Sequence, residues 1–185
     1  MKIAMIGSNP QTRGQKPGAK SDWQRWGMNN IKFSDPDLWF ELHKNINVNF
    51  LRNNIDCPIM VRSNSNAELL KNAAKYPFWQ MIPKYGYVFA STVDYMIALA
   101  IEKGAEEIGI WGIQMTCSET YRAMRPYTSY WMGLAKTKGI KVYMADKEGP
   151  QPDMTLTKPE PNVYCRQELL QPRTLLSGIP DLYLE

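Results

Sequence analysis

Small and polar residues directly after the first strand-like run are the first sign of chemistry in this chain. Residues 2–7 have the pattern of a buried strand and lead into Gly7-Ser8-Asn9-Pro10. A glycine lets a ligand approach the backbone, and successive free amides can hold phosphate oxygens. Ordinary turns use the same residue types, and neither the dinucleotide fingerprint nor the phosphate loop ending in Gly-Lys-Ser/Thr is present. A nucleotide-binding corner and a plain turn therefore stand as equal alternatives.

A basic loop follows this corner. Arg13, Lys16 and Lys20 all precede Asp22, the first acidic residue of the chain. A protein that binds duplex nucleic acid needs a broad basic face, whereas this chain mixes both signs and has a formal net charge of only +4. The loop fits a small anionic ligand, over whose phosphates it would close as a lid. A nucleic-acid partner is not expected.

Polar residues stand at three further places where the predicted strands end or a helix begins. In an open α/β sheet, ligands bind beyond the carboxyl ends of the strands, and a helix N-terminus favours an anion. Each residue also has a simpler explanation, as a turn, a cap or a loop residue, and their joint placement favours a site. The set comprises Asn29 and Asn30 after residues 23–28, Ser91 and Thr92 at the start of a helix, and Gly112 and Gln114 at the end of the strand expected over residues 106–112.

The single histidine belongs to the same predicted edge. His43 ends a strand expected over residues 37–43, and Glu41 lies two positions before it. An imidazole at a binding edge can act as a general base near neutral pH, so His43 and Glu41 are the candidate catalytic residues. The alternative is a hydrogen-bonded histidine with a structural role.

Residues 117–131 contain groups that suit a nucleotide. Tyr121 can stack on a base, and Arg122 and Arg125 can hold a phosphate. The alternative is a surface loop with one ion pair to the following helix. Cys117 has no histidine or cationic run beside it in the sequence, so nucleophilic catalysis through its thiol is not expected.

Strands that alternate with helices position these groups. The helix over residues 91–104 is the clearest, because Ser91 can cap it, Gly104 can end it and apolar residues recur at helical spacing. Strands are also expected at residues 2–7, 37–43, 57–62, 106–112 and 140–145, and helices at 65–77, capped by Ser65, and 126–139, opened by Pro126. The alternation predicts the α/β class: a single Rossmann-like domain whose mostly parallel sheet carries helices on both faces.

The composition changes near residue 145. Six of the 13 prolines lie in residues 146–185, together with apolar residues up to the end of the chain. We therefore expect a nucleotide-binding domain over residues 1–145 and an extended, proline-rich C-terminal arm over residues 146–185. Docking of the apolar arm on a neighbouring copy would produce a homo-oligomer.

Cysteine usage indicates a compartment. Cys57, Cys117 and Cys165 are odd in number and far apart, which argues against disulfides and for the reducing cytoplasm. No membrane span and no leader are expected. With one histidine and no Cys-x-x-Cys, no metal site is expected. The sequence identifies no cofactor, and Mg²⁺ bound together with a nucleotide is the one candidate.

The order of these segments carries a family resemblance. The run "GSNP" after strand one, "MNN" after strand two, "STVDYMIALAIEKGAEEIGIWGI" and a tyrosine-rich loop resembles the bacterial sialyltransferases that use CMP-sialic acid. It is also similar to a Rossmann-like group that contains archaeal hydroxymethyl-dihydropterin pyrophosphokinases. The blocks "WG-N", "F-E-L-H" and "YW-GLAK-KGI" resemble small phage proteins. The resemblance covers roughly residues 1–145.

The resemblance implies roles for individual residues. Gly7 to Pro10 would approach the phosphates and ribose, Asn29 or Asn30 would contact the nucleotide, and the turn from Gly112 to Gln114 would contact the base. Ser91 and Thr92 would match the family's small hydroxyl pair. This chain departs from the family at two positions. The family has an Asp where this chain has Gln114. The family also has a histidine base downstream of that turn, whereas no histidine follows His43 in this chain.

Three functions follow from the sequence. The first is a cytosolic, phage-type nucleotide-binding protein that acts as a transferase on a nucleotide or nucleotide-sugar, with His43 or Glu41 as the base. The second is a module without chemistry that sequesters a signalling nucleotide. The third is an interaction role in which the C-terminal arm docks on a partner.

Overall fold

The computed structural model of the chain describes residues 1–161. In this part of the chain, strands and helices are interspersed along the sequence, as expected for an α/β fold. The strands are β1 (Lys2–Ile6), β2 (Trp23–Met28), β3 (Leu38–Glu41), β4 (Ile59–Val61), β5 (Ala73–Lys75), β6 (Glu107–Trp111) and β7 (Lys141–Met144). The helices are α1 (Pro10–Arg13), α2 (Val48–Asn54), α3 (Asn64–Glu68), α4 (Phe78–Tyr85), α5 (Thr92–Glu102) and α6 (Glu119–Thr137).

One seven-stranded sheet organises the molecule. Its strands run in the order β5-β4-β3-β2-β1-β6-β7, and every neighbouring pair is parallel. The α/β class and the parallel sheet are therefore confirmed. The chain moves outward from β1 to β5 and then returns to the other side of β1 to form β6, so the order of the strands reverses between β1 and β6.

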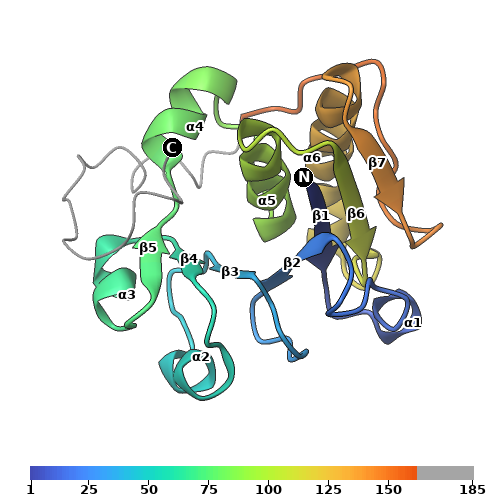
Figure 1. Cartoon of the computed structure of the whole chain (residues 1–185). Coiled ribbons are helices and arrows are strands. Elements are labelled where there is room, and N and C mark those ends of the chain that lie inside the picture. Colours follow the sequence, from blue (N-terminus) through green and yellow to red (C-terminus); the bar gives the residue numbers. More distant parts are fainter. Residues whose placement is uncertain (162–185) are drawn as a thin grey trace.

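Helices cover both faces of this sheet. Helices α4, α5 and α6 lie on one face and α2 on the other (Figure 1). Helix α5 packs against β1, β3 and α6, and its buried residues include Met96 and Ile97. The central strands are correspondingly buried on both sides, with Trp26 and Trp39 fully inside the core. Burial of this apolar surface is the main force that holds the layers together.

Helix α5 forms as its sequence predicts. Ser91 accepts a hydrogen bond from the backbone N–H of Asp94, and Asp94 accepts one in return from the N–H of Ser91. This reciprocal pair is the capping box. At the other end, Gly104 has a φ of +68°, the left-handed conformation expected of a helix-terminating glycine.

The helix expected over residues 65–77 is wrong. A short helix, α3, is capped by Ser63 rather than Ser65, and the chain then forms β5. Ala73 and Ala74 pair in parallel with Ile59 and Met60 of β4. The tertiary pairing at the sheet edge thus overrides the helix propensity of the alanines.

The start expected for the last helix is also wrong. Helix α6 begins at Glu119, seven residues before Pro126, because the Ser118 hydroxyl accepts a hydrogen bond from the N–H of Tyr121 and caps it there. Pro126 lies inside the helix, where it lacks the N–H that would bond to the preceding turn. Helices α1, α2 and α4 were not expected from the sequence.

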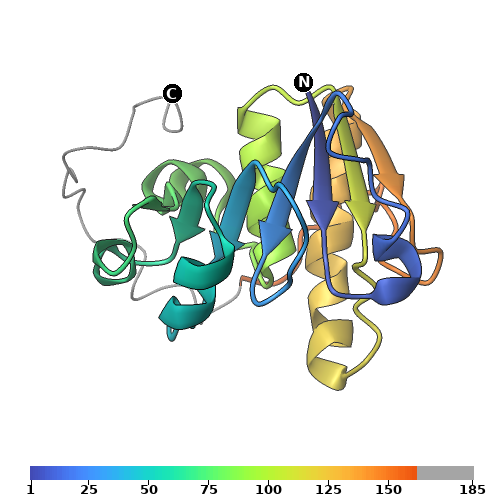
Figure 2. The ribbon, with the colours of Figure 1, turned by 60° about the horizontal axis from the view of Figure 1, so that its bottom comes forward.

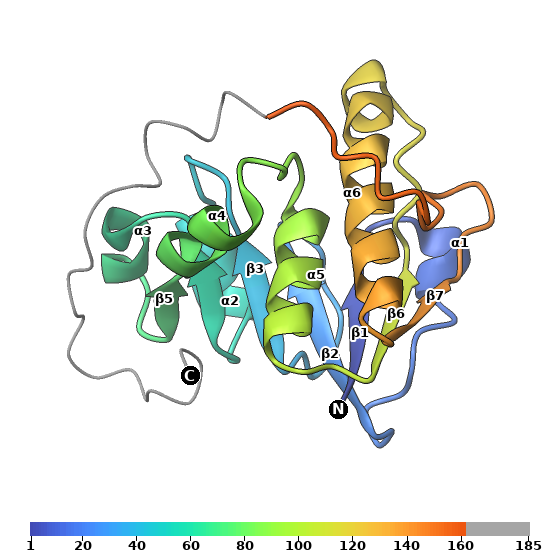
Figure 3. The same cartoon turned by 90° about the horizontal axis from the view of Figure 1, so that it is seen from above.

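Residues 146–161 form neither helix nor strand and lie along α6 (Figure 3). The backbone N–H of Asp153 donates to the carbonyl of Ser129, and the Tyr127 hydroxyl donates to the carbonyl of Glu160. The rest of the proline-rich arm, residues 162–185 with Cys165, lies outside the described residues, as does any oligomer contact through it.

Candidate functional site

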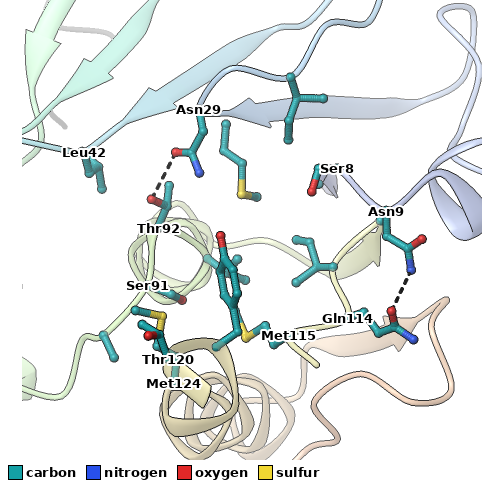
Figure 4. A pocket seen from close by; sticks show the side chains of 18 of the residues that line it. Ser8, Asn9, Asn29, Leu42, Ser91, Thr92, Gln114, Met115, Thr120 and Met124 are labelled. Carbon is teal, nitrogen blue, oxygen red and sulfur yellow. Dashed lines mark hydrogen bonds between the residues drawn. The ribbon is translucent and has the colours of Figure 1, made fainter. Parts of the chain in front are cut away.

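A cleft of about 1520 Å³ opens at the carboxyl edge of the sheet. The strand arrowheads point to this edge, where α1 and the first turns of α6 also lie (Figure 2). Figure 4 shows side chains from the strand ends, from α5 and from α6 converging on the cleft. Its lining includes twelve of the predicted site residues: Gly7, Ser8, Asn9, Pro10, Asn29, Asn30, His43, Ser91, Thr92, Gly112, Gln114 and Tyr121.

Two glycines bring the ends of β1 and β6 into direct backbone contact. The N–H of Gly7 donates to the carbonyl of Trp111 at 2.7 Å, and the N–H of Asn9 donates to the carbonyl of Gly112 at 2.8 Å. A Cβ on Gly7 would lie 2.4 Å from the Gly112 carbonyl oxygen. Gly112 itself has a φ of +71°. Only glycine fits at both positions, and their contact forms the floor of the cleft where the strand order reverses.

The Asn9 side chain is fully used in holding this corner together. Its carbonyl oxygen accepts the N–H of Gln11 at the start of α1. Its amide donates to the Asp146 carboxylate at 2.7 Å and to the Gln114 carbonyl at 3.4 Å. Gln114 in turn donates to Glu148 at 2.7 Å. Asn9 therefore ties β1 to the loops after β6 and β7, and the exposed Ser8 beside it faces the cleft (Figure 4).

Asn29 is held in a left-handed turn after β2. Its φ is +55°, a conformation that asparagine tolerates better than most residues. The indole of Trp39 donates to its carbonyl at 3.0 Å, and its N–H donates to the carbonyl of Phe40 at 2.9 Å. The Asn29 side chain meets Thr92 across the cleft, where the Thr92 hydroxyl donates to the side-chain amide oxygen of Asn29 at 3.5 Å (Figure 4).

A buried carboxylate underlies the hydroxyl pair at the start of α5. Asp94 accepts hydrogen bonds from the N–H groups of Ala90 and Ser91 and from the Thr128 hydroxyl of α6. Burial raises the pKa of Asp94 to about 6, although these hydrogen bonds oppose the shift. Both amides belong to residues that precede α5, and at the start of the helix the side chains of Ser91 and Thr92 lie at the cleft (Figure 4).

His43 and Glu41 form a pair at the β3 end of the cleft, which His43 lines and the buried Glu41 does not. Strand β3 ends at Glu41, so His43 lies just beyond the strand rather than at its end. The Nδ1 of His43 is hydrogen bonded to the Glu41 carboxylate, and the His43 side chain is 59% exposed against 2% for Glu41. The hydrogen bond to Glu41 raises the pKa of His43 above 6.5. Glu41 thus orients the ring from below, and Nε2 is the nitrogen available to a substrate.

The cleft also contains residues that the sequence reasoning missed. Lys44 and Arg62 add positive charge beside His43, at the ends of β3 and β4. Arg62 closes the predicted strand 57–62, so the rule that placed Asn29 at a strand end applies to it equally. Met115 and Met124 contribute apolar surface, and their types gave no functional signal in the sequence.

Three predicted phosphate ligands lie outside the lining. Arg13 is the last residue of α1, and Arg122 and Arg125 belong to α6 rather than to a loop. The Arg125 guanidinium donates to the carbonyl of Gly149 at 3.0 Å, so it anchors the segment after β7. Tyr121, one residue before Arg122, does line the cleft and is 46% exposed.

The described part of the chain has neither a cluster of metal ligands nor a helix suited to crossing a membrane. Over residues 1–161, no three His, Cys, Asp or Glu side chains gather as metal ligands. Within the same residues, no helix combines the length and the apolar character needed to cross a bilayer.

The fold is shared with a known glycosyltransferase structure. No protein-family model matches the sequence, and no curated protein matches it. The sialyltransferase CstII from Campylobacter jejuni with cytidine-5'-monophosphate, a substrate analogue, aligns with a TM-score of 0.54 and 19% identity over 80% of each chain. CstII with CMP-3FNeuAc aligns with a TM-score of 0.55 and 18% identity, over 78% of this chain and 79% of that chain. CST-II with a trisaccharide acceptor and CMP aligns with a TM-score of 0.54 and 16% identity, over 78% of this chain and 81% of that chain.

Proposed function

We propose that this chain is a transferase that binds a nucleotide-activated sugar in the carboxyl-edge cleft and transfers the sugar to an acceptor hydroxyl. The observation that carries the proposal is the presence of two features in one cleft: a corner built from two glycines where the strand order reverses, and His43 at the β3 end, hydrogen bonded to the buried Glu41. The shared fold supports it, since the similar structures contain CMP or CMP-3FNeuAc.

The nucleotide would lie over the corner formed by Gly7 and Gly112. Nucleotides bind at the strand-order reversal of such sheets, where the backbone can come close to phosphate. The exposed Ser8, together with the hydroxyls of Ser91 and Thr92, would donate to the phosphate and ribose. Tyr121 lies in the first turn of α6 and would stack on the base.

Transfer needs one base and one leaving group. The acceptor hydroxyl gives its proton to Nε2 of His43, and its oxygen forms a bond to the anomeric carbon of the sugar. The bond from that carbon to the phosphate oxygen breaks, and the nucleotide leaves with the electron pair. Glu41 stabilises the imidazolium that results. Catalysis would otherwise depend on positioning and on hydrogen bonds to the leaving phosphate.

A module that sequesters a nucleotide without turning it over is the second candidate. One observation favours it: among the described residues that line the cleft, none is Asp or Glu. The position where the resemblance places an aspartate is Gln114, whose amide groups are engaged by Asn9 and Glu148. Such a cleft would bind a nucleotide through neutral donors and release it unchanged.

The setting of the protein is part of the same proposal. The resemblance to phage proteins supports a phage-type chain, and the cysteine usage supports the cytoplasm. We also propose a domain over residues 1–145 followed by an arm over residues 146–185 that mediates a homo-oligomer. A relation to the pterin pyrophosphokinases stays at the level of the resemblance in sequence.

A thermal-shift screen followed by product analysis tests the proposal. CMP, CMP-N-acetylneuraminate, UDP-N-acetylglucosamine and cyclic nucleotides would be compared with and without Mg²⁺. A ligand at a hundredfold excess over its dissociation constant should add about 2.7 kcal/mol to the free energy of unfolding. Altered product after incubation supports the transferase, whereas ligand recovered intact supports sequestration. A screen in which no nucleotide stabilises the protein contradicts both.

A further inference from the structure

The charge of the cleft is confined to one end. Three basic side chains line it, His43, Lys44 and Arg62, and all three follow β3 or β4. The lining at the β1 and β6 end consists of glycine, amide, hydroxyl and apolar residues. We call the group of His43, Lys44 and Arg62 the basic end of the cleft.

The basic end is held in place by buried polar contacts. Asn66 of α3 is 8% exposed, and its amide donates to the carbonyls of His43 at 3.3 Å and Lys44 at 3.4 Å. Glu41 fixes the His43 ring from below. The register pairs Glu41 with Val61, so Arg62 directly follows the neighbouring position on β4. The loop that carries His43 and Lys44 is therefore anchored by hydrogen bonds to α3, and Arg62 is placed by its position directly after β4.

The position of the basic end assigns it to a part of the substrate other than the nucleotide. Adjacent strands lie about 4.8 Å apart, so β3 is roughly 10 Å and β4 roughly 14 Å from β1. A nucleotide over the Gly7–Gly112 corner would have its phosphate close to β1. Groups that reach β3 and β4 would belong to the sugar or to the acceptor.

We propose that Lys44 and Arg62 form a subsite for an anionic group of the acceptor, a carboxylate or a phosphate, which holds the acceptor hydroxyl at His43. The inference rests on the proposed function, because it presumes a nucleotide-sugar at the other end. A guanidinium can bind either anion through two parallel hydrogen bonds, and the lysine adds a second charge-assisted contact. Proximity of the anion to His43 would also strengthen the base.

The single histidine makes the test direct. Since His43 is the only histidine, its imidazole NMR signals need no assignment by mutation. Glucuronate and glucose 6-phosphate would be titrated, at constant ionic strength, into protein saturated with CMP, and neutral glucose would serve as the matched control. We expect both anions to shift the His43 signals and raise its pKa, and glucose to do neither. If neither anion shifts the His43 signals, or if glucose shifts them equally, the proposal is overturned.

Variants locate the response. Arg62→Gln and Lys44→Gln should each weaken glucuronate binding by about tenfold, the loss expected for a charge-assisted hydrogen bond. Arg62→Lys keeps the charge but loses the two parallel hydrogen bonds, so its affinity for glucuronate should lie between those of Arg62→Gln and the unaltered chain. Lys71→Gln removes an exposed lysine just before β5, at the opposite edge of the sheet, and should change nothing. Equal loss in Lys71→Gln and Arg62→Gln would assign the effect to net charge and overturn the subsite.

A second arm separates the acceptor from the sugar donor. CMP-3FNeuAc carries a carboxylate on its own sugar, whereas CMP does not. If prior saturation with CMP-3FNeuAc abolishes the glucuronate response, the donor occupies the basic end and the acceptor assignment is overturned. If glucuronate still binds, the assignment is supported. Binding of CMP itself is measured separately, and the anion titration is also run on free protein, so failure of the proposed function leaves a distinct result.

Discussion

The two ends of the cleft are built in different ways. At the β1 and β6 end, the site consists of backbone in close contact and of amide side chains whose hydrogen bonds are already used. At the β3 and β4 end, it consists of charged and titratable side chains that project from anchored loops. The first arrangement suits the positioning of a ligand, and the second suits proton transfer. Changes at the two ends should therefore affect affinity and rate separately.

The largest effect is expected at the glycine corner. In Gly7→Ala, the new methyl group would lie 2.4 Å from both the Gly112 carbonyl oxygen and a side-chain carbon of Ile113. The backbone of β1 and β6 must separate, which should cost about 1–3 kcal/mol of stability and abolish nucleotide binding. Urea unfolding and calorimetric titration with CMP measure the two effects.

Gly18→Ala is the matched control for this change. Nothing lies within 4 Å of the position that its methyl group would take, so stability and CMP affinity should stay close to those of the unaltered chain. A Gly7→Ala protein that binds CMP normally would show that the corner is an ordinary turn.

At the other end, His43→Ala should abolish transfer while leaving nucleotide affinity nearly intact. Removal of a general base costs about 10²- to 10⁴-fold in rate, and His43 makes no contact with the glycine corner in the described hydrogen bonds. Steady-state rates and CMP titrations of the same variant separate the two quantities. An unchanged rate would remove His43 from the mechanism.

The pH dependence sharpens this assignment. His43 must be deprotonated to accept a proton, so the rate should fall as the pH drops through its raised pKa. Glu41→Gln removes the carboxylate that raises this pKa, and the acid limb of the pH–rate profile should move to lower pH. A limb that stays in place would assign the titration to another group.

Beneath the middle of the cleft, Asp94 should make stability depend on pH. Its pKa is raised from 3.8 to about 6 because it is buried, so the folded state binds this proton more tightly than the unfolded state. The contribution to stability is therefore greatest below about pH 4 and declines as the pH rises to about 6. The difference of about two pKa units corresponds to roughly 3 kcal/mol.

Urea unfolding between pH 4 and pH 7.5 measures this decline. In Asp94→Asn the part of the decline below about pH 6 should be lost, because the raised pKa of His43 acts at higher pH. In Asp56→Asn, which changes an exposed carboxylate, that part should persist. Parallel pH curves for Asp94→Asn and the unaltered chain would contradict the assignment.

The smallest effect is expected behind the glycine corner, at Asp146. One carboxylate oxygen accepts the Asn9 amide and the other accepts the N–H of Glu148, and an asparagine has only one such oxygen. Asp146→Asn should weaken CMP binding by about tenfold. Glu148→Gln alters an exposed contact and should change the affinity less than twofold. Equal effects of the two changes, measured by calorimetry, would refute a specific role for Asp146.

Local pattern was sufficient for the elements that carry their own signals. Strands β1 and β6 and helix α5 follow from short apolar runs and from the cap at Ser91. The prediction failed where distant partners decide, as in β5, whose alanines become a strand only because β4 lies beside them. At α6 it failed for a local reason, because the cap at Ser118 starts the helix before Pro126.

The same distinction applies to the site. Its position follows from the strand ends, because parallel strands bring their carboxyl ends to one edge. The structural role of Asn9 depends on hydrogen bonds to Gln114 and Asp146, which are 105 and 137 residues away in the chain. No local sequence pattern shows such contacts. Lys44 and Arg62 were visible at strand ends, but their charge gains meaning only when the fold places both beside His43.

The most direct test of the account is the fate of a bound nucleotide-sugar. Purified protein would be incubated with CMP-N-acetylneuraminate, UDP-N-acetylglucosamine or GDP-mannose and a mixture of neutral and anionic saccharides, then denatured and analysed by mass spectrometry. We expect free nucleotide together with a glycosylated saccharide for one of these donors, and neither product in His43→Ala. A donor that binds tightly and is recovered intact would contradict transfer and leave a nucleotide-binding module.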